Sequence, residues 1–183
     1  KIFDYKKVEI RISTHAIEYA IQSYPTITDA IAFTYQQEGH SFYVLTFPTA
    51  DKTWVFDVST EMWHERAGFV DGEFTRHRAQ CQMFFTGVTF VGDYENGNIY
   101  TYSLSTYTDN AASQKYLRSW RALPPGQNNL NRSAHHSLQL NCESGVGLDG
   151  TGQGTDPQVL LRWSDDGGHT WSNEHSKSLG RIG

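Results

Sequence analysis

Short segments in which apolar and polar residues alternate follow one another along the first two thirds of the chain. The first four are residues 30–35 (AIAFTY), 41–47 (SFYVLTF), 53–58 (TWVFDV) and 62–67 (MWHERA). Turn-forming residues separate them, with Gly39 in the first connection and Pro48 in the second. Because alternation with a period of two is typical of β-strands, this region is predicted to form four short strands.

The same pattern returns further along the chain. Residues 42–63 (FYVLTFPTADKTWVFDVSTEMW) align without a gap on residues 88–109 (VTFVGDYENGNIYTYSLSTYTD), at an offset of 46 residues. Four short strands in a repeat of about 40 to 50 residues are typical of a β-propeller blade. The predicted fold is therefore all-β and β-propeller-like, with antiparallel four-stranded blades over residues 1–118.

The second repeat is predicted to contain strands at residues 78–85, 87–93 and 97–103, followed by a poorer fourth strand. Its turn Glu95-Asn96-Gly97-Asn98 predicts a hairpin, because Asn-Gly accepts the positive φ angles that tight hairpins require.

One short helix is predicted before the first strand. Ser13 or Thr14 can accept backbone hydrogen bonds at its N-terminus. Ile17 and Ile21 follow at helical spacing, and Pro25 ends the segment.

The sequence changes character after about residue 118. Residues 122–133 read as a linker, 137–143 (SLQLNCE) as a strand, 145–157 as a Gly-rich loop and 159–164 (VLLRWS) as another strand. Residues 119–183 are thus predicted to be a linker and a C-terminal β unit. Since the chain begins with Lys1 and opens on a strand-like segment, we expect it to be a fragment of a longer protein.

Residues 164–171 (SDDGGHTW) fill every fixed position of the pattern Ser-x-Asp-x-Gly-x-Thr-Trp. This octet resembles the Asp-box of sialidases and other β-propeller proteins. We expect Asp166 to accept hydrogen bonds from turn amides, Gly167 and Gly168 to adopt positive φ, and Trp171 to pack beneath the hairpin. The role predicted for the box is structural, not catalytic, and its residues are Ser164, Asp166, Gly168, Thr170 and Trp171.

Charge and composition narrow the function. Lys and Arg number 15 against 20 Asp and Glu, which leaves a formal charge of −5. Wrapping nucleic acid needs clustered cations, and the densest basic stretch, Arg76-His77-Arg78, is interpreted as solvated surface. No apolar run approaches the roughly 20 residues of a membrane helix, so no membrane partner is expected. The two cysteines, Cys81 and Cys142, are predicted to be free thiols buried in strands.

No enzymatic motif is complete. Residues 63–66 (WHER) lack the second His of a zinc protease helix, and the Gly-rich stretch from 145 lacks the helix of a dinucleotide site. Sialidase residue types occur without a surrounding motif. Carboxylates that could be nominated for glycoside hydrolysis are Asp51, Asp57, Glu61 and Glu65. The prediction is no enzyme, with no catalytic, cofactor-binding or metal-binding residue.

Several ordered stretches are similar to one family. They are RISTHAIEYAIQSY, DAIAFTYQQEGHSFYVLTFP, TWVFD, MWHERA, RHRAQC, VGDYENGNIY, YTDN, GVGL and DPQVLLRWSDDGGHTWSNEH. From about Arg11 to Gly183 the chain resembles the packaged-DNA stabilisation proteins of short-tailed bacteriophages, also called tail accessory factors or head-closure proteins.

The resemblance implies a non-enzymatic virion component at the head–tail junction, assembled in the host cytoplasm. It implies a ring of six copies that meets the portal and its adaptor, the tail needle or tip, and the tailspikes. The implied mechanism is plugging of the portal channel without sequence-specific nucleic-acid binding, which agrees with the negative charge. We expect the loops at 68–75, 122–133 and 145–157 to carry most partner contacts.

Two other interpretations stay open. The chain could be a carbohydrate-binding or sialidase-type propeller that recognises host glycans, with Trp54, Trp63, Trp120 and Trp163 as stacking platforms. It could also be a repeat scaffold unrelated to phage.

Overall fold

The computed structural model describes residues 11–106, 108–110, 112–121, 134–145, 147–151 and 154–181. The chain forms two compact units, Lys1–Leu117 and Arg118–Gly183. The described part is mostly β-structure with one short helix, as predicted, and none of its small antiparallel sheets closes into a ring. Among the helices described, none has the length and apolar character needed to cross a membrane.

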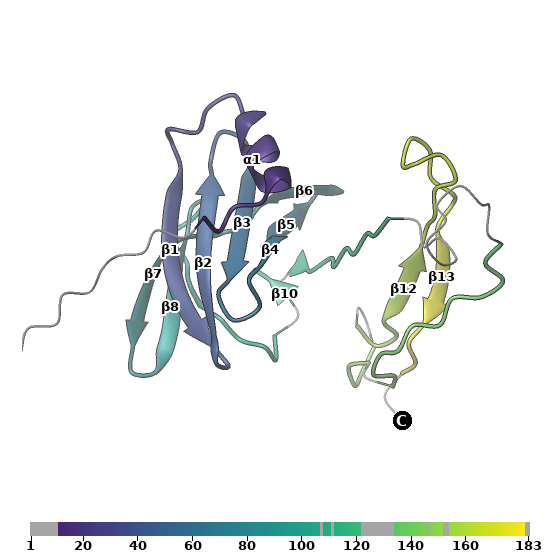
Figure 1. The fold of residues 1–183 in the computed structure, drawn as a ribbon. Coiled ribbons are helices and arrows are strands. Elements are labelled where there is room, and N and C mark those ends of the chain that lie inside the picture. Colours follow the sequence, from purple (N-terminus) through teal and green to yellow (C-terminus); the bar gives the residue numbers. More distant parts are fainter. Residues whose placement is uncertain are drawn as a thin grey trace, which may run out of the picture. The chain divides into compact units, whose positions relative to one another are not determined.

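The first unit is built on a four-stranded antiparallel sheet in the order β1-β2-β3-β4 (Figure 1). Its strands are β1 (Ile31–Gln37), β2 (His40–Phe47), β3 (Lys52–Asp57) and β4 (Met62–Glu65). All four lie where the alternating pattern predicts them. The β1–β2 turn places Glu38 and Gly39 at positive φ, which matches the right-handed twist of the flanking strands.

Both faces of this sheet are covered. Val44 and Val55 pair across β2 and β3 and are fully buried on the face turned toward the second sheet. On the opposite face lies helix α1 (His15–Gln22), whose cap Thr14 accepts the Ile17 N–H at 3.4 Å as the sequence predicts. Trp54 Nε1 donates to the Tyr24 hydroxyl at 2.9 Å just after this helix. The helical segment is therefore fixed to the sheet through a tryptophan of β3.

Residues 68–75, expected to be a partner-binding loop, instead belong to a hairpin of β5 (Ala67–Val70) and β6 (Glu73–Arg76). The loop assignment is wrong because Asp71-Gly72 forms a tight turn with both residues at positive φ. The expected partner contacts of this segment stay a prediction. The Asp-Gly pair was a hairpin signal present in the sequence.

The second sheet has three strands, β7 (Ala79–Phe85), β8 (Val88–Asp93) and β9 (Ile99–Thr101). Strand β7 lies beside β1 (Figure 1). The expected fourth strand does not join: β10 (Thr108–Asp109) and β11 (Ala112–Ser113) pair with each other. The β8–β9 hairpin is confirmed, but Asn96 and Gly97 are not at positive φ, so its turn has a different geometry from the one predicted.

The buried cysteines are not found. Cys81 and Cys142 are both free thiols, as predicted, but both are exposed. In β7, Cys81 shares an exposed face with Met83 and Phe85, while Val91 of β8 is buried on the other face. Strand β7 is therefore found where it was predicted, but its face with Cys81, Met83 and Phe85 is exposed to solvent and not buried.

The second unit contains one antiparallel pair, β12 (Gln158–Leu161) and β13 (His175–Ser178). Strand β12 ends three residues before the predicted end at Ser164. Residues 137–143, predicted to be a strand, have no regular secondary structure. The predicted linker 122–133 lies outside the described residues.

Candidate functional site

The two sheets of the first unit meet in an aromatic core. Tyr35, Val44 and Val55 of the first sheet form its buried centre, and Tyr102, which follows β9, packs against them. The rings of Tyr35 and Tyr102 are 4.6 Å apart. A shallow groove beside this core is lined from both sheets, and no carboxylate or imidazole lines it.

A partly buried cation lies against this aromatic core. The Arg66 guanidinium donates to the Tyr35 hydroxyl at 2.7 Å and lies 5.6 to 5.8 Å from the ring centroids of Tyr35, Phe42 and Tyr102. A guanidinium near several ring faces is attracted by their quadrupoles, more strongly when water is excluded. Because Arg66 directly follows β4, this contact joins the last strand of the first sheet to the end of β9.

His77 lies in the connection between β6 and β7, and its ring is next to that of Tyr102. Its N–H donates to Thr53 Oγ1 at 3.1 Å, and its Nδ1 accepts the Ala79 N–H at 3.1 Å. Burial, helped by the neighbouring Arg66 charge, lowers the pKa of His77 to about 3. His77 is therefore a neutral acceptor at neutral pH.

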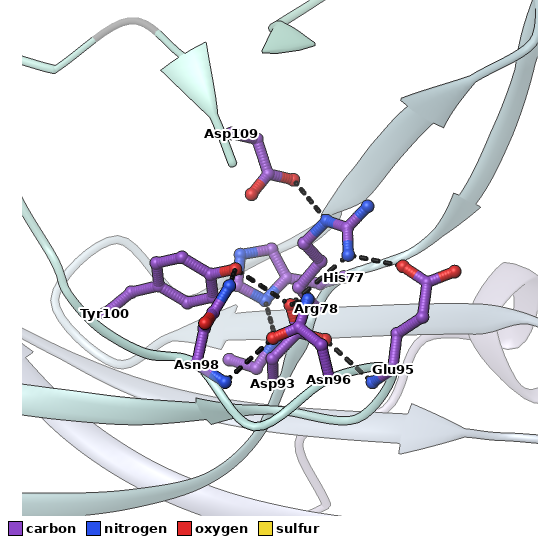
Figure 2. A network of polar contacts seen from close by, with 9 residues as sticks. His77, Arg78, Asp93, Glu95, Asn96, Asn98, Tyr100 and Asp109 are labelled. Atoms are coloured by element: carbon purple, nitrogen blue, oxygen red, sulfur yellow. Dashed lines mark hydrogen bonds and ion pairs between the residues drawn. The ribbon is translucent and has the colours of Figure 1, made fainter. Parts of the chain in front are cut away.

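The adjoining Arg78 forms a cluster with three carboxylates, Asp93, Glu95 and Asp109, which we call the Arg78 cluster (Figure 2). Only 15% of the Arg78 side chain is exposed, and that of Asp93 is fully buried. Arg78 Nη1 lies 3.2 Å from Asp93 Oδ2, and Nε lies 3.7 Å from Asp109 Oδ2. The cluster joins the start of β7, the β8–β9 turn and β10.

The carboxylates of the cluster differ in their electrostatics. Burial acts to raise the pKa of Asp93, but the Glu95 N–H, the Tyr100 hydroxyl and Arg78 outweigh it and leave the pKa below its usual value. Burial raises the pKa of Asp109, against the opposing charge of Arg78. Asp93 is thus firmly ionised, while Asp109 is the carboxylate of this pair that acid neutralises first.

The interpretation of Arg76-His77-Arg78 as solvated surface is therefore wrong for His77 and Arg78. One signal was in the sequence. Antiparallel pairing of the predicted strands places Ala79 opposite Asp93, so the neighbouring Arg78 approaches that carboxylate. The sequence offered Arg66 only as one of the sialidase residue types, and no pattern placed it beside these aromatic rings.

The carboxylates nominated for glycoside hydrolysis have other contacts. Asp57 accepts from His40 Nδ1, the Ser59 N–H and the Thr60 hydroxyl at 2.8 to 2.9 Å. Asp51 accepts the Arg76 N–H, and Glu65 pairs with Lys52. None of these contacts joins two of the four carboxylates. Within the described ranges, no three His, Cys, Asp or Glu side chains are grouped so that they could hold a metal ion.

The octet of the second unit forms a hydrogen-bonded turn. Asp166 accepts the Thr170 N–H at 2.8 Å and the Thr170 hydroxyl at 2.6 Å, and Ser164 Oγ donates to Asp166 at 2.8 Å. Gly167 and Gly168 both have positive φ. Hydrogen bonds from Thr170 and Ser164 lower the pKa of Asp166 to about 2.

Trp171 departs from the expected packing. It is 52% exposed, and its Nε1 donates to the Gly168 carbonyl at 3.1 Å. The ring therefore closes the turn by a hydrogen bond and is not covered by it. Beyond the turn, Ser172 N–H donates to the Trp163 carbonyl, and Trp163 stacks on His175 at 4.8 Å.

Comparison with known proteins places the first unit in a phage context. A model of the family described as "Bacteriophage P22 Gp10, beta-propeller" matches residues 5–107, more than half of the chain. The match includes both sheets, Arg66 and His77, and it ends before the Asp-box turn. Neither the curated proteins nor the solved structures contain a match.

Replacing Arg78 is expected to destabilise the first unit. The Arg78→Met variant leaves the buried Asp93 without its cation, which costs about 3 kcal/mol of unfolding free energy. The matched control is Lys52→Met, which breaks the half-exposed pair with Glu65 and costs about 0.5 kcal/mol. Urea unfolding followed by tryptophan fluorescence measures both, and equal effects would contradict a buried cluster.

Acid is expected to destabilise the fold through His77. The folded pKa of about 3 lies below the unfolded value of about 6.5, so the unfolded chain binds a proton that the folded chain refuses. The contribution of neutral His77 to the free energy of unfolding is fully present above pH 6.5, the unfolded pKa. It declines as the pH falls toward 3, by up to about 1.4 kcal/mol per pH unit.

The variant His77→Gln is expected to flatten this pH dependence, measured by urea unfolding from neutral pH down to about pH 4. His15→Gln changes a histidine that is 95% exposed and serves as the control. An unchanged slope in His77→Gln would contradict the assignment.

Asp166 is expected to hold its turn together even in acid. Asp166→Ala removes both acceptors of Thr170, so the Thr170 amide exchanges with solvent faster than in the unmodified chain, measured by NMR. Asp165→Ala, one residue away, leaves those hydrogen bonds in place and should not change the exchange rate. Since the pKa of Asp166 is about 2, protection of Thr170 should persist until the pH approaches that value.

Proposed function

The chain belongs to the family described as bacteriophage P22 Gp10, beta-propeller, and from this membership we propose that it closes the portal channel of the phage head. Membership makes the protein a structural virion component that stabilises packaged DNA. The channel-closing role, at the head–tail junction, is the finer step that we add.

The match over both sheets carries the proposal, and the observed junction suits the task. Packaged DNA presses on whatever closes its channel, so the closure must resist deformation. In the first unit, each sheet is hydrogen-bonded internally, the Arg66 aromatic core joins the two sheets, and the Arg78 cluster ties the second sheet to the β10–β11 hairpin. Packed interiors have low compressibility, so such a pair of sheets is stiff.

Retention of DNA is proposed to be steric. The chain carries a formal charge of −5, the same sign as DNA, and Arg66 and Arg78 are engaged in contacts within the protein. A negatively charged protein repels the DNA backbone, so physical obstruction accounts for retention better than affinity does.

The assembled state follows from the same resemblance. We propose a ring of six copies that contacts the portal or its adaptor, the tail needle or tip, and the tailspikes, after assembly in the host cytoplasm. The propeller region of residues 1–118 would form the closure, and residues 119–183 a separate β unit. Within that unit, the Asp-box residues Ser164, Asp166, Gly168, Thr170 and Trp171 serve the fold and not a reaction.

Two of the four tryptophans nominated for glycan recognition have other contacts in the structure. Trp54 and Trp63 are tied to the helical segment through Tyr24 and Ile12. Trp120 and Trp163 remain about half exposed. These two could still meet a sugar, so glycan binding is retained as an outcome of the test.

DNA retention by heads that lack this protein is the direct test. Adding the full chain to DNA-filled heads should produce sedimenting complexes that keep their DNA, whereas an unrelated acidic protein of similar size should not. Arg78→Met, with its weakened junction, should retain less DNA than Lys52→Met. If the wild-type protein neither binds the heads nor retains DNA, channel closure is wrong. Binding to a glycan array in its place would support host-glycan recognition.

A further inference from the structure

The β8–β9 turn contains Asn96-Gly97, the one Asn-Gly step in the sequence. Both residues are exposed, and a Cβ added to Gly97 would meet no atom within 4 Å. Water therefore reaches this step, and no neighbouring side chain shields it. The turn nevertheless adjoins the Arg78 cluster, because Asp93 begins it.

An asparagine followed by glycine can lose its amide without a catalyst. The Gly97 nitrogen would bond to Asn96 Cγ, the Cγ–Nδ2 bond would break, and the Gly97 proton would leave with the amide as ammonia. Water then opens the cyclic imide to aspartate or isoaspartate. No oxidant or other reactant is needed, and the missing Cβ of glycine leaves the attacking nitrogen accessible.

Two hydrogen bonds hold the Asn96 side chain in the folded protein (Figure 2). Nδ2 donates to Asp93 Oδ2 at 2.9 Å, and Oδ1 accepts the Asn98 N–H at 2.8 Å. Cyclisation requires the side chain to turn away from both partners toward Gly97. We propose that Asn96 is a deamidation site, that these hydrogen bonds slow the reaction in the folded chain, and that its product loosens the Arg78 cluster.

Deamidation destabilises the Arg78 cluster because it places a negative charge next to the Asp93 carboxylate. Deamidation to aspartate replaces the Nδ2 donor by an oxygen facing Asp93 Oδ2, which also accepts from Arg78 and from the Tyr100 hydroxyl. The cluster already sets three carboxylates around one guanidinium. A fourth carboxylate, at position 96, cannot donate the hydrogen bond to Asp93, and its charge repels the fully buried Asp93 carboxylate. Isoaspartate also lengthens the backbone within the turn.

Ageing the full-length protein at mildly alkaline pH tests the site and its protection. Peptide mapping by mass spectrometry follows conversion of Asn96, in buffer and in denaturing urea. We expect Asn96 to convert first among the asparagines in urea, and at least about tenfold more slowly in the folded chain, as two side-chain hydrogen bonds would give. Earlier conversion of another asparagine in urea would overturn the site, and equal rates in both solvents would overturn the protection.

Two variants test the consequence. Asn96→Asp supplies the product directly and should lower Tm by about 4 °C, and aged wild-type protein should approach that value as conversion proceeds. Gly97→Ala is the matched control, because Gly97 is not at positive φ and an added Cβ has free space. It should fold normally, resist conversion and keep its Tm on ageing. A wild-type Tm in Asn96→Asp would overturn the proposed effect on the cluster.

Discussion

The packing of the first unit depends on the contacts of the Arg66 guanidinium. A guanidinium that is partly withdrawn from water needs hydrogen-bond acceptors or aromatic faces in place of the water that it loses. Here Tyr35 supplies a hydroxyl, and Tyr35, Phe42 and Tyr102 supply the rings. Since Tyr102 comes from the end of the second sheet, this requirement is met only when the two sheets are packed together. The neutral state of His77 follows from the same charge and burial.

The Arg78 cluster extends the junction outward. Strand pairing brings Arg78 to Asp93, and the β8–β9 turn adds Glu95. The third carboxylate, Asp109, lies beyond β9 in a hairpin that belongs to neither large sheet. Arg78, of which only 15% is exposed, thus links to the second sheet a hairpin that has no strand pairing with it. In the proposed channel closure, such a link would add stiffness between the second sheet and the hairpin.

The same sequence pattern gives a fourth sheet strand in the first repeat and a separate hairpin in the second. The offset of 46 residues that aligns the strands places β4 of the first sheet on residues 108–111. In the first repeat this segment completes the sheet. In the second, its counterpart turns away as β10 and directs Asp109 to Arg78. In the first repeat, Trp63 Nε1 donates to the Ile12 carbonyl. At the equivalent position of the second repeat, the Asp109 carboxylate pairs with Arg78.

Local pattern alone determined the four strands of the first repeat, the first three of the second, the short helix with its Thr14 cap, and the family resemblance, because alternation, capping and turn chemistry act between residues close in sequence. The hydrogen bonds of Asp166 were foreseeable for the same reason. Tertiary structure decided which faces were covered. Alternation marked one face of β7 as apolar but could not tell that Cys81 is exposed there, and basic residues at 76–78 looked solvated although Arg78 is nearly enclosed. Burial of a side chain depends on partners brought in from distant segments. The rings around Arg66 meet only after the two sheets have packed, and Asp109 reaches Arg78 from a hairpin outside both sheets.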